Sequence, residues 1–132
     1  MPYLVAYIAT AVAFLAIDFV WLGYVVKEFY AREMGSLLRA SPDFSIAAVF
    51  YLGYIAGIVF FAVAPALAAQ SWKVALLNGA LLGLLAYGTY DLTNLATLEG
   101  WPWRMALVDM TWGAGLTGVA ALAGYFAARA LA

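Results

Sequence analysis

The chain has 132 residues, of which 68% are hydrophobic and only 10% are charged, and its formal net charge is −1. Soluble domains contain about 25% charged residues, so this composition indicates an integral membrane protein. The small net charge argues against a nucleic-acid partner. Because the chain has no histidine and no cysteine, we expect no haem, iron–sulfur, zinc or copper cofactor. An intramembrane metal would have to be an oxygen-liking ion such as Mg or Mn, and we predict no metal site.

Four apolar stretches are each long enough to cross a bilayer, which takes about 20 helical residues. They cover residues 3–26, 44–69, 73–98 and 102–130. The second and third connections are short, so consecutive helices are expected to be antiparallel. We therefore predict an all-α integral membrane protein, with residues 1–132 forming a single transmembrane domain built as an antiparallel four-transmembrane-helix bundle.

The first connection is long enough to hold a further element. Apolar residues recur there at helical spacing, and charged residues are distributed between them: Tyr30, Met34, Leu37 and Leu38 against Lys27, Glu28, Arg32 and Arg39. This pattern predicts a short interfacial amphipathic helix over residues 27–39.

Capping and proline signals mark several predicted helix ends. Ser41 is expected to cap the second membrane helix and Ser71 the third. Pro42 and Pro102 are expected to open the second and fourth helices, and Pro65 should kink the end of the second.

Basic residues give the orientation. The first connection and the start of the fourth helix carry four of them, whereas the opposite side has only Lys73 and Arg129. This asymmetry favours the first and third connections in the cytoplasm, with both termini outside.

Small residues recur at four-residue spacing on three of the predicted membrane helices. The pairs are Gly53 with Gly57, Gly79 with Gly83, and the looser Ala114 with Gly118. Such faces allow close helix packing. We expect them to pack within the bundle, and a homodimer through the glycine-rich faces is the alternative.

A polar stripe interrupts the third membrane helix. Tyr87, Asp91 and Asn94 are spaced i, i+4 and i+7, so they share one helical face. A charged aspartate at the centre of a membrane helix costs about 2.5–3.5 kcal/mol on insertion scales, and such residues usually face protein or water.

Three aspartates are expected at one depth in the membrane. Counted from the predicted helix ends, Asp18, Asp91 and Asp109 all fall roughly 8–12 Å below the surface that carries the first and third connections. No Lys or Arg is expected at that depth, so burial favours a protonated or proton-sharing carboxyl group. Each of Asp18 and Asp109 is followed three residues later by a tryptophan, whose indole N–H could donate to a carboxylate on a neighbouring helix.

The predicted site comprises the acidic and aromatic residues of this layer, with Asp91, Asp109 and Asp18 as the candidates for acid/base catalysis. Its members are Asp18, Trp21, Tyr51, Tyr54, Tyr87, Tyr90, Asp91, Asn94, Asp109 and Trp112. The remaining tryptophans, Trp72, Trp101 and Trp103, are interpreted as anchors at the membrane interface.

Three segments resemble a bacterial family of small predicted four-helix membrane proteins, defined only as a domain of unknown function (DUF2177-like). They are residues 17–23, 87–95 and 108–113, and the similarity extends over nearly the whole chain, including the turn at residues 100–102. The resemblance implies four membrane helices in the bacterial inner membrane and supplies no activity.

Three functional hypotheses remain open. The first is binding or transport of a small amphipathic, cationic or lipid-like ligand, held by the three aspartates, stacked on Trp21 and Trp112, and coupled to protons through an aspartate. The second is an enzyme of lipid or isoprenoid modification that uses Asp91 or Asp109 as general acid/base. The third is an accessory subunit of a larger membrane complex. Membrane lipids are expected partners in every case.

Overall fold

The computed structural model describes residues 1–39 and 41–132, and over this part of the chain it contains helices and no strand. The α-helical class predicted from the sequence is thus confirmed. The observed elements are α1 (Pro2–Val20), the π-helix η1 (Trp21–Val25), α2 (Lys27–Met34), the 3₁₀ turn η2 (Gly35–Leu37), α3 (Phe44–Ile58), the π-helix η3 (Val59–Val63), α4 (Ala64–Ala69), α5 (Trp72–Thr97) and α6 (Trp103–Leu131).

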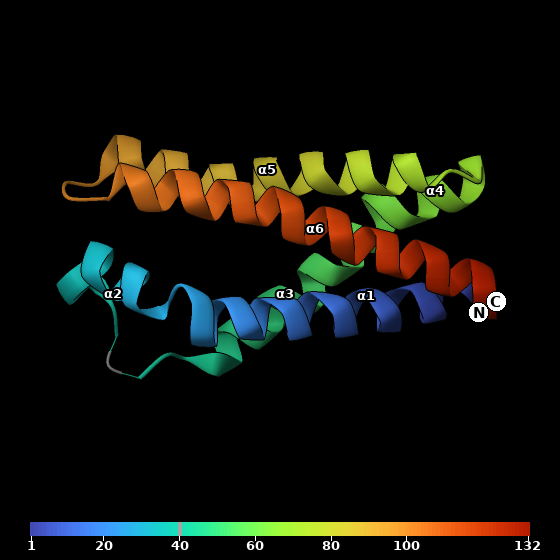
Figure 1. Cartoon of the computed structure of the whole chain (residues 1–132), viewed down its shortest axis with the longest axis horizontal. Helices are drawn as coiled ribbons and strands as arrows, with labels where there is room; N and C mark the ends of the chain where they lie inside the picture. The colour runs from blue at the N-terminus through green and yellow to red at the C-terminus, as the bar shows by residue number, and fades with distance from the viewer. Residues whose placement is uncertain (40) are drawn as a thin grey trace.

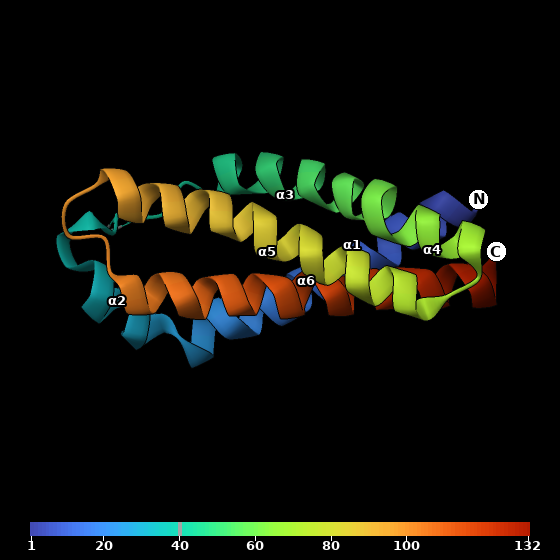
Figure 2. The same ribbon diagram turned by 90° about the horizontal axis from the view of Figure 1, so that it is seen from above.

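The long helices run along one common axis (Figures 1 and 2). One end of the molecule carries α2 and the turn from α5 to α6, and we call it the α2 end. The opposite end carries both termini and the turn from α4 to α5, and we call it the termini end. Helix α6 packs along α5 on one side and along α1 on the other. The first and third connections therefore meet at the same end.

Within the described residues, three helical segments are long and apolar enough to cross a membrane: Pro2–Val25, Phe44–Ala69 and Trp103–Leu131. The prediction of four membrane-spanning helices is therefore supported for three of them. Helix α5 has 26 residues, but polar side chains such as Asn78, Asp91 and Asn94 lower its mean hydropathy.

The distribution of apolar residues also fits a membrane protein. Large apolar side chains such as Phe19, Val49 and Phe60 are more than half exposed, whereas the interior includes the small residues Ala62 and Ala120, which are fully buried. Small interior residues let membrane helices approach closely, and the exposed apolar surface suits lipid. The packing of the helices therefore agrees with the membrane class that the composition indicated.

One glycine pair forms the contact between α5 and α6. A Cβ added at Gly83 would lie 2.1 Å from the Gly113 carbonyl oxygen, and one added at Gly79 would lie 2.9 Å from the Thr117 carbonyl oxygen. These glycines pack within the chain, as the sequence indicated. Gly53 meets nothing within 4 Å, so the expectation of internal packing is wrong for the pair on α3.

Several helix ends differ from the sequence-based expectations. Helix α3 is capped by Asp43, whose carboxylate accepts from Ser45 N at 3.1 Å and Ile46 N at 3.3 Å, and not by Ser41. Hydrogen bonds from the Ser45 hydroxyl and from these backbone amides lower the pKa of the Asp43 carboxyl group. Ser71 precedes α5 without a side-chain cap bond. Helix α2, for which the sequence predicted an interfacial helix over residues 27–39, is shorter than predicted, because Gly35 takes a φ of +54°.

The expected distortion near Pro65 is a π-helical segment, η3, just before α4. Proline has no backbone N–H, so the carbonyl of Phe61, four residues earlier, loses its usual helical donor. The Asn78 side chain of α5 donates to this carbonyl at 3.1 Å. An amide on a neighbouring helix therefore satisfies the group that the proline leaves free.

Candidate functional site

Asp18 of α1 links this helix to two others. Its side chain is 5% exposed, and it accepts hydrogen bonds from the Tyr51 hydroxyl of α3 at 3.0 Å and from Trp112 Nε1 of α6 at 3.1 Å. The second bond is the donation from an indole to a carboxylate on a neighbouring helix that the sequence predicted. Both carboxylate oxygens of Asp18 are thus satisfied.

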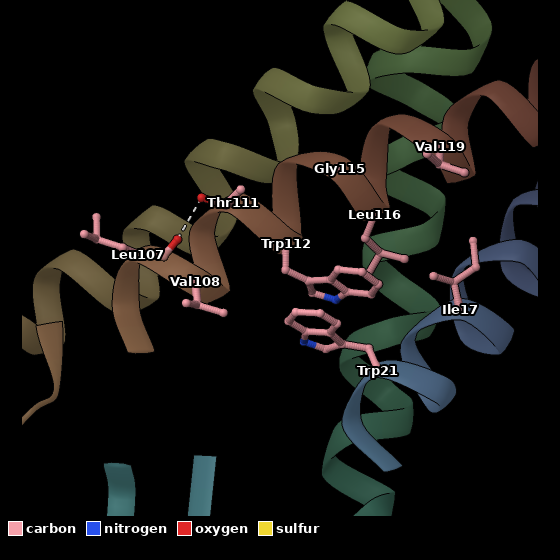
Figure 3. A pocket seen from close by; sticks show the side chains of 9 residues that line it. All are labelled: Ile17, Trp21, Leu107, Val108, Thr111, Trp112, Gly115, Leu116 and Val119. Carbon is pink, nitrogen blue, oxygen red and sulfur yellow. Dashed lines mark hydrogen bonds between the residues drawn. The ribbon is translucent and has the colours of Figure 1, made fainter. Parts of the chain in front are cut away.

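The indoles of Trp21 and Trp112 stack on each other, with ring centroids 4.0 Å apart and planes 5° apart (Figure 3). They border an apolar pocket of about 590 Å³ between α1 and α6, which is lined by Ile17, Trp21, Leu107, Val108, Thr111, Trp112, Gly115, Leu116 and Val119. Because their facing surfaces are occupied by each other, a cation has no place between the two rings. Stacking of a ligand on these indoles therefore stays a prediction, and it concerns the ring faces that Trp21 and Trp112 turn away from each other.

Asp109 accepts a hydrogen bond from the Tyr30 hydroxyl of α2 at 2.9 Å. Burial, together with the Asp109 carboxylate, raises the pKa of the Tyr30 hydroxyl, so at neutral pH this group is a donor. Trp21 Nε1 lies beside the same hydroxyl, but it is buried without a hydrogen-bond partner in the described part of the chain. Helix α2 therefore contributes directly to the acidic layer.

Asp91 is fully buried, and neither of its carboxyl oxygens has a hydrogen-bond partner within residues 1–39 and 41–132. Its carboxyl group faces that of Asp109 and lies beside the indole of Trp101. Trp101 Nε1 is likewise buried and unpartnered among the described residues. Two adjacent carboxylates repel each other unless they share a proton or a cation neutralises them. This pair is therefore the least satisfied polar group in the layer.

Tyrosines form the rest of the layer. The Tyr54 hydroxyl bonds Thr117 Oγ1 at 2.8 Å, and the half-buried Tyr87 packs its ring on Gly113. Tyr90 is half exposed and packs edge-on against Trp101, with ring centroids 5.3 Å apart.

Asn94 is half-buried on the face it shares with Asp91. Its side chain makes no hydrogen bond within the described ranges. The structure thus brings the three aspartates and most of the aromatic residues together, and leaves Asn94 at the margin.

A second pocket, of about 500 Å³, reaches Asp109 from the side of α3 and α5. It is lined by Phe50, Tyr51, Ala86, Tyr87, Thr89, Tyr90 and Asp109. Asp109 is the charged member of this lining, and four aromatic side chains supply its walls. We call it the acidic–aromatic pocket.

The acidic layer lacks a basic counter-ion in the part of the chain that the structure describes. The ion pair observed among the described residues joins Arg104 Nε to Glu33 Oε1 at 3.5 Å. It lies near the α2 end, outside the three-aspartate layer. Among the described residues, no group of three or more acidic side chains is arranged to hold a metal ion.

Three functional neighbours were missed by the sequence analysis. Tyr30 was interpreted only as part of the apolar face of an interfacial helix, and Trp101 only as an interface anchor, yet Trp101 is 8% exposed and lies beside Asp91. Thr117 was not considered. The depth of Asp109 below the α2 end is the signal that could have suggested a donor from the covering helix.

These observations define a small helical membrane protein with a buried acidic and aromatic layer. A family described as "Predicted membrane protein (DUF2177)" matches residues 3–126, and the chain belongs to this family. The match confirms the resemblance found in the sequence, and the family description names no activity. No curated protein and no solved structure matches the chain.

Proposed function

We propose that the protein crosses the bacterial inner membrane four times and binds a small amphipathic cation in the acidic–aromatic pocket. The fourth crossing follows from connectivity. Helix α4 ends at the termini end and α6 begins at the α2 end, so if both neighbours span the membrane, α5 must cross between them. The excess of basic residues at the α2 end favours the cytoplasm for that side.

The observation that carries the proposal is the pocket of about 500 Å³ that holds Asp109 among aromatic side chains. A half-buried carboxylate without a basic partner, such as that of Asp109, is stabilised by a bound cation, and the faces of Tyr51, Tyr87 and Tyr90 attract the same charge. The apolar part of an amphipathic ligand suits the ring of Phe50. These features favour a cation with a hydrocarbon chain over an anion or a sugar.

The Asp91–Asp109 pair supplies a means of coupling to protons. Without ligand, one shared proton removes the repulsion between the two carboxyl groups. A cation that binds at Asp109 compensates the same charge, so it replaces the proton, which leaves to water. Binding should then weaken as the pH falls, because protons compete for the pair.

The test uses the purified protein in a neutral maltoside detergent, with octyltrimethylammonium as the probe and octyl sulfate as the anion of equal chain length. Isothermal titration in buffers of different ionisation enthalpy measures the affinity and the protons released. We expect the cation to bind with proton release and octyl sulfate not to bind. Asp109→Asn should weaken cation binding at least tenfold, or about 1.4 kcal/mol.

Two further variants make this experiment specific. Glu28→Gln removes a carboxylate at the same end of the molecule, outside the pocket, and should leave binding unchanged. Asp91→Asn offers an amide N–H to the Asp109 carboxylate, so binding should persist without proton release and without pH dependence. Equal binding of octyl sulfate, or unchanged binding by Asp109→Asn, would refute the proposal.

The same carboxyl pair favours one second candidate, an enzyme that performs acid/base chemistry on a lipid. A proton-sharing dyad can give a proton to one atom of a substrate and remove one from another. Mass spectrometry of lipid bound before and after incubation separates the two functions. A binding or transport protein returns the lipid unchanged, whereas an enzyme changes its mass or double-bond position.

A further inference from the structure

A third pocket, of about 360 Å³, lies between α2 and the first turn of α6, and none of its lining belongs to the acidic–aromatic pocket. Phe29, Arg32 and Glu33 line it from α2, and Arg104 lines it from α6. Both elements lie at the α2 end of the molecule (Figure 1). At the ends of membrane helices, side chains meet the headgroups of lipids.

The pocket is held in shape by the packing of α2 on α6. Trp101, Met105 and Ala106 are buried in a small apolar cluster, against which Phe29, Tyr30 and Met34 of α2 pack. The hydrogen bond from the Tyr30 hydroxyl to Asp109 of α6 adds a polar contact between the same two helices. The two arginines therefore project from elements whose relative position is set before any ligand arrives.

The charges of the pocket are unbalanced. Arg104 pairs through Nε with Glu33, and that contact leaves the terminal guanidinium nitrogens of Arg104 able to donate elsewhere. Arg32 is exposed and has no ion pair among the described residues. Two arginines against one glutamate give the lining a net charge of +1. No side chain caps the first turn of α6, so the helix dipole adds positive potential on the same side.

We propose that this pocket binds the phosphate group of an anionic phospholipid, with Arg32 and Arg104 as its donors. Guanidinium groups match the geometry of phosphate oxygens and are preferred for them. Basic pockets between membrane helices at the headgroup level bind acidic lipid headgroups. Phe29 provides an apolar wall for the glycerol and the start of an acyl chain. The inference is independent of the cation proposed for the other pocket.

Native mass spectrometry of the full chain in detergent tests the inference, with dioleoyl-phosphatidylglycerol, dioleoyl-phosphatidylcholine and inorganic phosphate as probes. We expect phosphatidylglycerol to bind at least fivefold more tightly than phosphatidylcholine, and inorganic phosphate to be retained weakly. Arg32→Gln should lower the affinity for phosphatidylglycerol at least fivefold. This variant leaves the Arg104–Glu33 ion pair intact, so the fold should be unchanged.

Two controls separate a built site from general attraction. Arg39→Gln removes the same charge from the same connection outside the pocket and should change the affinity less than twofold. Glu33→Gln removes the negative charge of the lining and should strengthen binding, an effect that a purely structural role for Glu33 does not give.

Three results would overturn the inference. They are equal losses for Arg32→Gln and Arg39→Gln, equal binding of the two lipids, and binding of inorganic phosphate as tight as that of the lipid. The last of these would assign the pocket to free phosphate instead.

Discussion

Replacing Asp18 tests whether this residue is a structural link between helices or a charged part of the site. In Asp18→Ala, the Tyr51 hydroxyl and Trp112 Nε1 both lose their acceptor. Unpaired buried donors cost about 1–3 kcal/mol each in soluble proteins. Hydrogen bonds between membrane helices are weaker, averaging about 0.6 kcal/mol with a maximum near 1.7. For two bonds we expect a loss of about 2 kcal/mol.

Asp18→Asn should cost far less, because both hydrogen bonds can be kept. The indole of Trp112 can only donate, so the amide oxygen must face it. The amide nitrogen then faces Tyr51, whose hydroxyl oxygen can accept instead of donating. We expect a loss below about 1 kcal/mol, within the scale of single membrane hydrogen bonds.

The free energy of unfolding is measured in mixed micelles by titration with sodium dodecyl sulfate, and it is followed by far-UV circular dichroism. A double-mutant cycle of Asp18→Ala with Tyr51→Phe isolates one of the two bonds. If Asp18→Asn destabilises the protein as much as Asp18→Ala does, the link is not hydrogen bonding and the charge itself is required. That result would move Asp18 from the structural part of the layer into the ligand site.

Two further predictions concern the packing and the capping of helices. Gly83→Ala should destabilise the protein by about 1–3 kcal/mol or more, because the added methyl would lie 2.1 Å from the Gly113 carbonyl oxygen; Gly53→Ala, which meets nothing within 4 Å, should be neutral or slightly stabilising in the same unfolding titration. The pKa of Asp43 is lower in the folded protein than in the unfolded chain. Its contribution to the free energy of unfolding is therefore complete above the unfolded pKa of about 3.9 and is lost as the pH falls through the lower folded pKa. Stability measured between pH 6 and pH 3 should fall less in Asp43→Ala than in the wild type, and parallel curves for the two proteins would contradict the capping role.

The sequence was sufficient for the helical class and for the expectation that the three aspartates lie near one another. Hydropathy and the length of the apolar stretches depend on composition alone, and the rise per residue of a helix converts positions into depths. The indole donor to Asp18 could also be predicted. Trp112 lies one helical turn after Asp109, and Asp109 was expected at the same depth as Asp18. The membrane crossing by α5 stays a prediction, because its length of 26 residues suffices but its polar stripe lowers its hydropathy below that of the other three segments.

The rotation of each helix about its own axis could not be obtained from depth. The π-helical segment η1 begins at Trp21, and no sequence signal marked it, so the stack of Trp21 on Trp112 was not foreseen. Trp101 lies in a turn, where helical periodicity assigns no face. The facing of Asp91 and Asp109 depends on how closely α5 approaches α6, which a long-range contact sets.

That contact explains why the three aspartates, although they belong to one layer, have different surroundings. Helix α5 comes close to α6 because Gly83 and the ring of Tyr87 both pack on Gly113. This close approach places Asp91 against Asp109. Asp18, by contrast, receives a donor on each oxygen, so its burial is offset by hydrogen bonds that also join helices. Packing alone would be served as well by an apolar residue at position 91, since a buried carboxyl group without partners only costs free energy. A proton shared by Asp91 and Asp109, or a ligand bound at this pair, accounts for the buried carboxyl group, whereas a role in structural support does not.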